Sequence, residues 1–202
     1  MAKIYVVDDD PSARKSLSWL LETSSYSAEV FESAEEFLAA YHPEMSGCML
    51  LDMRMHGLGG LQLQQRLKAI GSQLPIIFIS GHVDVPTASE AFRAGACDVL
   101  TKPIDDSTLI SRVEEAIAKH QRARQQEQQD AAKQQQISTL TPRERDAFDQ
   151  LLKGVSIKQL AIHLGIGIQT AAKHRSRVLH KLGCSTDVEL VESYRDFAKR
   201  AG

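Results

Sequence analysis

The sequence has little cysteine and no long apolar run, and each of these absences argues against a class of protein. Its three cysteines, Cys48, Cys97 and Cys184, are odd in number, widely separated and form no Cys-x-x-Cys pair, so neither a disulfide framework nor a cysteine zinc site is expected. No stretch approaches the roughly 20 apolar residues of a membrane span, and the start at Met1 leads directly into a strand-like run without a signal-peptide pattern. We therefore expect a cytoplasmic protein with no membrane partner.

Length and charge divide the chain into two parts. Its 202 residues exceed the usual size of one domain, and a hydrophobic content of 43% can supply two modest cores. Residues 1–120 contain 10 Lys and Arg against 17 Asp and Glu, whereas residues 121–202 contain 14 against 9. An acidic half and a basic half suggest different partners, and the basic half is suited to the phosphate backbone of a nucleic acid.

Short apolar runs alternate with helix-like segments through the first 120 residues. Pro11 stands at a first-turn position, and Ser33 with Glu36 forms a capping box. Five repeats of strand and helix predict an α/β fold with a doubly wound, five-stranded parallel sheet. The predicted strands are Ile4–Val7, Ala28–Phe31, Cys48–Leu51, Ile76–Ile79 and Asp98–Leu100, and the predicted helices are Ser12–Thr23, Ala34–Tyr41, Gly60–Ile70, Val85–Ala94 and Ser107–His120.

The second half is predicted to be all-α. Residues 121–136 are rich in Gln, Ala, Arg and Glu without Pro or Gly, which suits either a disordered linker or an extension of the preceding helix; we favour a solvated helix that frays near Ile137. The predicted organisation is a domain over 1–120, a helical linker over 121–138 and a four-helix domain over 139–202. Its predicted helices are Pro142–Lys153, Ile157–His163, Gln169–Leu182 and Asp187–Lys199.

Acids, a hydroxyl and an ammonium stand at the ends of separate predicted strands of the first half. Because the carboxyl ends of parallel strands form the ligand crevice, these groups should meet there. Phosphoryl transfer to a carboxylate needs a nucleophile, a hard cation and donors for the remaining charge, and this set supplies all three. Asp10 is more readily interpreted as the cap of the first helix. The predicted roles are Asp52 as the acceptor, Asp8 and Asp9 as Mg²⁺ ligands, and Ser80 and Lys102 as donors to phosphoryl oxygens.

These motifs resemble the receiver domain of two-component response regulators of the FixJ type. The resemblance rests on Val6–Asp10, Leu51–Met55, Phe78–Pro86 and Lys102–Pro103 and covers Met1 to about His120. It implies that a sensor histidine kinase phosphorylates Asp52. It also implies that Asp9, Asp52 and the Arg54 carbonyl bind Mg²⁺, that Ser80 is the switch hydroxyl, that a cis proline follows Lys102, and that the strands are ordered 2-1-3-4-5.

Two positions depart from the family pattern. Val99 stands where an aromatic switch residue is usual on the fifth strand, so the usual coupling through a rotating ring is not expected. Where Met-Pro commonly follows the acceptor motif, this chain has Met55-His56-Gly57. His56 could modulate the pocket, although an exposed loop histidine is the favoured interpretation.

Two helices joined by a glycine-bearing turn, the second one basic, predict a helix-turn-helix. Helical spacing places Ala171, Val178 and Leu182 on an apolar side of the second helix. The segments Leu140–Arg145, Gly154–Ala161, Thr170–Arg175 and Lys181–Gly183 resemble the LuxR/NarL DNA-binding domain, although Gly167 replaces the usual Ser or Thr cap and Ala171-Ala172 replaces Val and a charged residue. The predicted DNA contacts are base edges for Lys173, Ser176 and Gln169, phosphates for Thr170, Arg177 and Lys181, and a further contact for Lys158.

These features predict a phosphorylation-controlled transcription regulator that binds promoter DNA as a dimer, works with RNA polymerase and is not an enzyme. One alternative is a receiver-controlled RNA-binding antiterminator, which the helix-turn-helix spacing disfavours. The other is a phosphatase with Asp52 as its nucleophile. Such enzymes need a second acid two residues further on, and Arg54 occupies that place.

Overall fold

The computed structural model describes residues 3–81 and 83–201, with Ala201 described by its backbone only. Met1, Ala2, His82 and Gly202, which belong to the predicted domains, lie outside the described residues. The chain divides into two compact units, residues 1–123 and residues 124–202. The residues that had been predicted as a linker therefore group mainly with the C-terminal unit.

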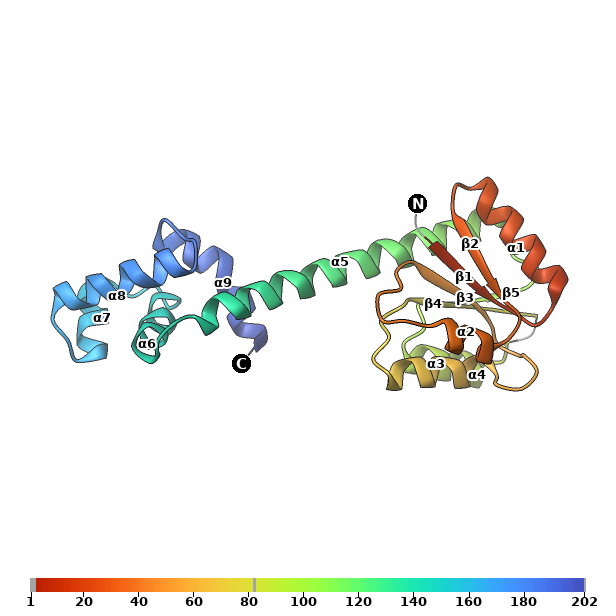
Figure 1. Ribbon diagram of the computed structural model, residues 1–202, viewed down its shortest axis with the longest axis horizontal. Helices are drawn as coiled ribbons and strands as arrows, with labels where there is room; N and C mark the ends of the chain where they lie inside the picture. Colours follow the sequence, from red (N-terminus) through yellow and green to blue (C-terminus); the bar gives the residue numbers. More distant parts are fainter. Residues whose placement is uncertain (1–2, 82, 202) are drawn as a thin grey trace. The chain divides into compact units, whose positions relative to one another are not determined.

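A five-stranded parallel sheet forms the centre of the first unit (Figure 1). Its strand order is β2-β1-β3-β4-β5, as the family resemblance implied. Every residue of β3 and β4 is buried, which agrees with a parallel sheet covered on both faces. The strands are β1 (Lys3–Val7), β2 (Ser27–Phe31), β3 (Cys48–Asp52), β4 (Ile76–Ser80) and β5 (Asp98–Thr101).

Helices cover both faces of this sheet (Figure 1). Phe37 of α2, Leu63 of α3 and Ala91 of α4 are buried in the core on one face, whereas Leu21 of α1 and Val113 of α5 are buried in the core on the other. The doubly wound α/β prediction is therefore confirmed. The helices are α1 (Pro11–Thr23), α2 (Ala34–Ala40), α3 (Gly60–Ala69), α4 (Val85–Ala94) and α5 (Asp106–Ser138).

Local capping signals set several of these helix starts. Asp10 caps α1, because its Oδ1 accepts the backbone N–H of Ser12 at 2.9 Å. Ser33 caps α2 by accepting the N–H of Glu36 at 3.1 Å. The reciprocal half of the predicted capping box differs, because Glu36 Oε2 accepts the N–H of Glu32 instead of that of Ser33.

Every secondary-structure element of the C-terminal unit that the structure describes is a helix. Phe148 of α6, Leu160 of α7, Val178 of α8 and Leu190 of α9 are buried in one core. Helix α6 ends before Lys153, where its end was predicted. The N–H groups of residues 153 and 154 donate to the carbonyl groups three residues earlier, and Gly154 has φ 76°, so the α-helix does not continue. The helices are α6 (Pro142–Leu151), α7 (Ile157–Leu164), α8 (Ile168–Lys181) and α9 (Asp187–Ala201).

The Gln-rich segment is helical, as predicted, and forms the second half of α5. The predicted fraying near Ile137 is wrong, because Ile137 is 3% exposed and belongs to the core of the C-terminal unit. Lys133 Nζ also donates to the carbonyl of Ser193 at 2.7 Å, and Tyr194 bonds to Gln136. Over the described residues, none of the helices combines the length and the apolar character that crossing a membrane requires.

Candidate phosphoacceptor site and nucleic-acid interface

The predicted acceptor residues meet at the carboxyl edge of the sheet. Asp52 and Ser80 are the last residues of the adjacent strands β3 and β4, and both are buried. Asp8 directly follows β1, and Lys102 directly follows β5. Because these strands are neighbours in the sheet, their ends converge, as the sequence predicted.

Lys102 joins two of the acids. Its Nζ donates to Asp8 Oδ2 at 2.8 Å and lies 3.4 Å from Asp52 Oδ1. Burial alone would lower the pKa of Lys102, but the hydrogen bond and charge of Asp8, with a contribution from Asp52, raise it above its usual value. The ammonium is therefore a stable positive charge beside the Asp52 carboxylate.

Asp52 is 8% exposed and is held in place by its own loop. Its Oδ2 accepts the backbone N–H of Arg54 at 2.8 Å. Burial raises the pKa of Asp52, and the charge of Asp8 raises it further. A pair of buried acids with one ammonium between them has excess negative charge, so this edge of the sheet favours a further cation.

Close packing fixes the backbone beneath Asp52. A Cβ atom on Gly60 would lie 2.3 Å from the Asp52 carbonyl oxygen and 3.1 Å from the Phe78 ring. The N–H of Gly60 donates to the Met53 carbonyl at 3.2 Å. The first residue of α3 can therefore be only glycine without a shift of the acceptor loop.

Asp9 contacts His56, for which the sequence favours an exposed loop position over a role in the pocket. Its Oδ2 accepts the backbone N–H of His56 at 2.9 Å, and the His56 Nδ1 atom lies 2.5 Å from the same oxygen. The backbone hydrogen bond lowers the pKa of Asp9, with smaller contributions from the His56 side chain. His56 is exposed, as predicted, yet it is part of the site. The only sign of this contact in the sequence is that His56 stands where the family commonly has proline.

Arg14 contacts this edge of the sheet, although no pattern in the sequence predicts it. Its Nη1 donates to the Asp8 carbonyl at 2.6 Å, and Asp8 Oδ1 accepts the N–H of Asp10 at 2.9 Å. These bonds fix the turn between β1 and α1.

In the described residues no three His, Cys, Asp or Glu side chains are grouped closely enough to hold a metal ion as they stand. The types of donor nevertheless fit Mg²⁺, which prefers carboxylate and carbonyl oxygens.

Ser80, the predicted switch residue, is bonded to the neighbouring strand end through its backbone. The N–H of Lys102 donates to the Ser80 carbonyl at 2.8 Å, which joins the ends of β5 and β4. The peptide bond between Lys102 and Pro103 is cis, as the resemblance implied. Val99 is partly buried against the core and pairs with Phe78 in the sheet. Its side chain has no ring that could rotate between two positions.

The predicted recognition helix is α8, and its two sides differ as expected. Ala171 and Val178 are fully buried, and Leu182, just after the helix, is 3% exposed. Gly167 is the N-cap residue and provides no side-chain bond to the helix. Among the described residues, the predicted DNA contacts that are exposed and form no ion pair are Lys158, Gln169, Thr170, Lys173, Ser176 and Arg177.

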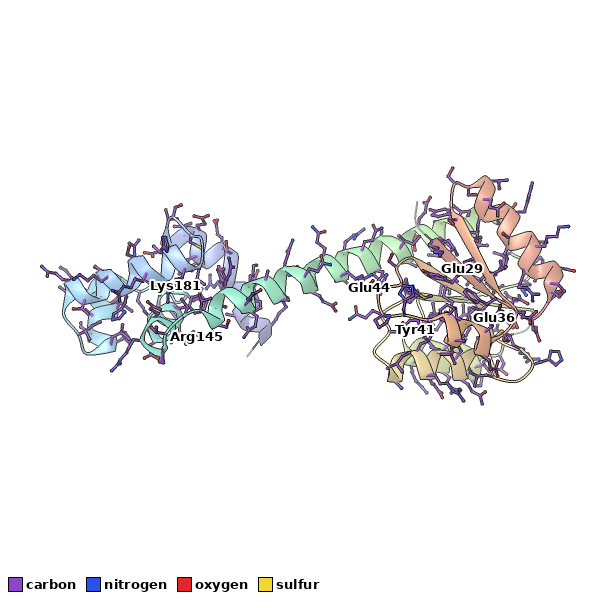
Figure 2. The ribbon with its side chains drawn as sticks, viewed as in Figure 1. Glu29, Glu36, Tyr41, Glu44, Arg145 and Lys181 are labelled. Atoms are coloured by element: carbon purple, nitrogen blue, oxygen red, sulfur yellow. The ribbon has the colours of Figure 1, made fainter. Side chains whose placement is uncertain are left out.

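Lys181 differs from these residues. Its Nζ forms an ion pair with Glu144 Oε2 at 2.7 Å and donates to the Thr139 carbonyl at 2.9 Å (Lys181 is labelled in Figure 2). Glu144 belongs to the capping box of α6 and is 3% exposed. The predicted phosphate contact of Lys181 therefore competes with a bond that holds α8 against α6.

Comparisons with known proteins agree with both halves of this description. Residues 4–114 match the family described as "Response regulator receiver domain", and residues 138–194 match "Bacterial regulatory proteins, luxR family". The transcriptional regulatory protein FixJ of Bradyrhizobium diazoefficiens is 38% identical over 98% of this chain and 95% of its own length. The transcriptional regulatory protein TdiR of Thauera aromatica is 38% identical over 93% of this chain and 83% of its own length.

Solved structures show the same relationship. The response regulator StyR has a TM-score of 0.85 at 35% identity, covering 96% of this chain and 98% of that one. Full-length FixJ from B. japonicum has a TM-score of 0.62 at 35% identity and covers 98% of both chains. The chain therefore belongs to the two-component response regulators, as a phosphorylation-controlled transcription regulator with a receiver domain and a LuxR-type DNA-binding domain.

Proposed function

We propose that Asp52 accepts a phosphoryl group from a sensor histidine kinase and that this modification controls binding to promoter DNA. The observation that carries the proposal is the position of Asp52 at the sheet edge, with Lys102 Nζ 3.4 Å from its Oδ1. A carboxylate there is an oxygen nucleophile beside a fixed positive charge. In the free protein the same ammonium also neutralises Asp8.

Each neighbouring residue has a separate task in this proposal. Lys102 and the Ser80 hydroxyl bind oxygens of the incoming phosphoryl group, and the Arg54 N–H orients the Asp52 carboxylate. Asp8, Asp9, Asp52 and the Arg54 carbonyl are the proposed Mg²⁺ ligands. When bound, Mg²⁺ would neutralise charge on the phosphoryl oxygens. Burial raises the pKa of Asp52, and the charge of Asp8 raises it further, which supports this cation requirement.

Labelling by a small phosphodonor tests the acceptor. The wild-type protein with Mg²⁺ should gain one acid-labile phosphoryl group, and Asp52→Asn should gain none. Asp10→Asn is the matched control, because Asp10 caps α1 and is not assigned to the pocket. Persistent labelling of Asp52→Asn, measured by mass spectrometry of the intact protein, would contradict the assignment.

For the DNA-binding half, we propose that two chains bind adjacent half-sites. One helix-turn-helix buries a modest area, whereas a dimer doubles the phosphate contacts and makes the second binding event intramolecular. In the receiver domain, we propose that two chains pair through the surface of α4. Two apolar side chains support this, because Val85 is 79% exposed and Phe92 is 49% exposed. The Asp187–Lys199 part of α9 is the proposed second contact. RNA polymerase is a further proposed partner, and promoter binding implies a cytoplasmic location.

Sedimentation combined with footprinting tests this mechanism. Phosphorylation should convert monomers to dimers and raise affinity for the operator. Equal operator affinity of the unphosphorylated protein and a strictly monomeric phosphorylated protein would contradict it.

The LuxR-family match supports DNA over the RNA alternative. Regulators of this family are in general not enzymes, and we propose that this chain has no turnover of its own.

A further inference from the structure

The contact between His56 and Asp9 places an imidazole beside a proposed metal ligand. The His56 imidazole is on the loop after β3, its side chain is fully exposed at 101% of the reference area, and it still faces the Asp9 carboxylate. Its Nδ1 atom is 2.5 Å from Asp9 Oδ2. An imidazole therefore lies at the mouth of a pocket whose other proposed ligands are all oxygens.

The spacing of these two atoms suits joint binding of one ion. Two neighbouring ligands of an octahedral divalent ion, each about 2.1 Å from the metal, are about 3 Å apart. The Nδ1 and Oδ2 atoms would need to separate by about half an ångström to reach that spacing. Because the His56 ring is exposed and has no core packing, it can make this movement without disturbing the sheet.

The donors around the other acids make Asp9 the accessible side of the pocket. Asp8 is 2% exposed and is bonded to Lys102 Nζ and the Asp10 N–H. Asp52 is bonded to the Arg54 N–H. The Asp9 side chain, at 26% exposed, is held by a residue that is itself in solvent. An ion entering from solvent therefore meets Asp9 and His56 first.

We propose that His56 Nδ1 is a metal ligand in the tautomer that carries its proton on Nε2, and that it shifts the cation site toward divalent ions that bind imidazole, such as Co²⁺, Ni²⁺ and Zn²⁺. This inference rests on the cation site of the proposed function. Imidazole nitrogen suits these ions, whereas Mg²⁺ prefers oxygen and water. The residue would set which metal the receiver prefers, without altering the acceptor Asp52.

Calorimetric titration of the full-length protein with CoCl₂ and, separately, MgCl₂ tests the proposal. His56→Ala should weaken Co²⁺ binding by about tenfold or more and change Mg²⁺ binding by less than about twofold. The matched control is His42→Ala, which removes another exposed histidine of the same unit and should alter neither titration. Equal Co²⁺ affinity of wild type and His56→Ala would overturn the proposal.

A direct readout of ligation accompanies the titration. In the Co²⁺-loaded protein, proton NMR should show hyperfine-shifted imidazole resonances that are lost in His56→Ala and kept in His42→Ala. Their absence from the wild-type spectrum would also overturn the proposal. If Asp9→Asn and Asp52→Asn leave Mg²⁺ binding unchanged, the cation site of the proposed function fails as well. If those variants lose Mg²⁺ binding but His56→Ala has no effect on Co²⁺ binding, only the histidine ligand is rejected.

Discussion

Glu144 of α6 and Lys181 of α8 form an ion pair in the C-terminal unit, with Oε2 and Nζ 2.7 Å apart. The Glu144 side chain is almost completely buried, and its carboxylate also accepts the N–H of Thr141 at 2.9 Å. One carboxylate thus caps α6 and holds the end of α8. The pair connects the stability of the unit to a residue that the sequence had assigned to DNA.

Replacing Lys181 should therefore destabilise the fold. Lys181→Met leaves the buried Glu144 carboxylate without its ion pair, and we expect a loss of about 1–3 kcal/mol in the free energy of unfolding. The control is Arg177→Ala on the same helix, which should leave the free energy of unfolding nearly unchanged. Urea unfolding followed by circular dichroism measures both. An unaltered unfolding midpoint in Lys181→Met would show that the pair contributes little.

The same pair predicts a pH dependence. The hydrogen bond from Lys181 lowers the pKa of Glu144 from its ordinary value to about 2, with help from the Thr141 N–H. The pKa of Glu144 is lower in the folded state than its unfolded value of about 4.3. The ionised carboxylate therefore stabilises the fold above about pH 4.3, and this stabilisation is lost as the pH falls toward 2. The stability difference between wild type and Glu144→Gln should therefore shrink over that range. A difference that stays constant from pH 6 to pH 2.5 would contradict this.

Gly60 should be intolerant of any side chain. The added methyl of Gly60→Ala would lie 2.3 Å from the Asp52 carbonyl, so the loop must shift. We expect a loss of about 1–3 kcal/mol in stability and slower labelling of Asp52 by a small phosphodonor. Gly59→Ala is the matched control, because its nearest heavy atom would be 3.8 Å away and should leave labelling nearly unaffected. Equal labelling rates in the two variants would argue against this packing constraint.

Two exposed residues of α8 should differ in how they affect DNA binding. Lys173→Ala should reduce discrimination between operator and random duplex, because we assign Lys173 to base edges. Arg177→Ala should weaken both duplexes alike and lower the salt dependence, because we assign Arg177 to a phosphate. Fluorescence anisotropy at several salt concentrations separates the two effects. Identical losses for both variants on both duplexes would remove the distinction.

Most helices and strands, and the meeting of the predicted acceptor residues at one sheet edge, could be predicted from the sequence alone. Strand ends placed Asp52, Ser80 and Lys102 together, because parallel strands that alternate with helices end at one edge. Buried positions at helical spacing, such as Ala171 and Val178, also identified the inner side of α8. These signals are local, since they depend on periodicity and capping within a few residues.

Contacts between side chains far apart in the sequence could not be predicted and follow from how the elements pack. His56 and Asp9 are 47 residues apart, and Lys181 and Glu144 are 37 residues apart. Neither contact follows from periodicity, because an exposed histidine or lysine can adopt many rotamers and its partner is set by how separate elements pack. The packing therefore gave Lys181 a structural bond where the pattern indicated a phosphate contact. It also brought His56 to the acceptor pocket.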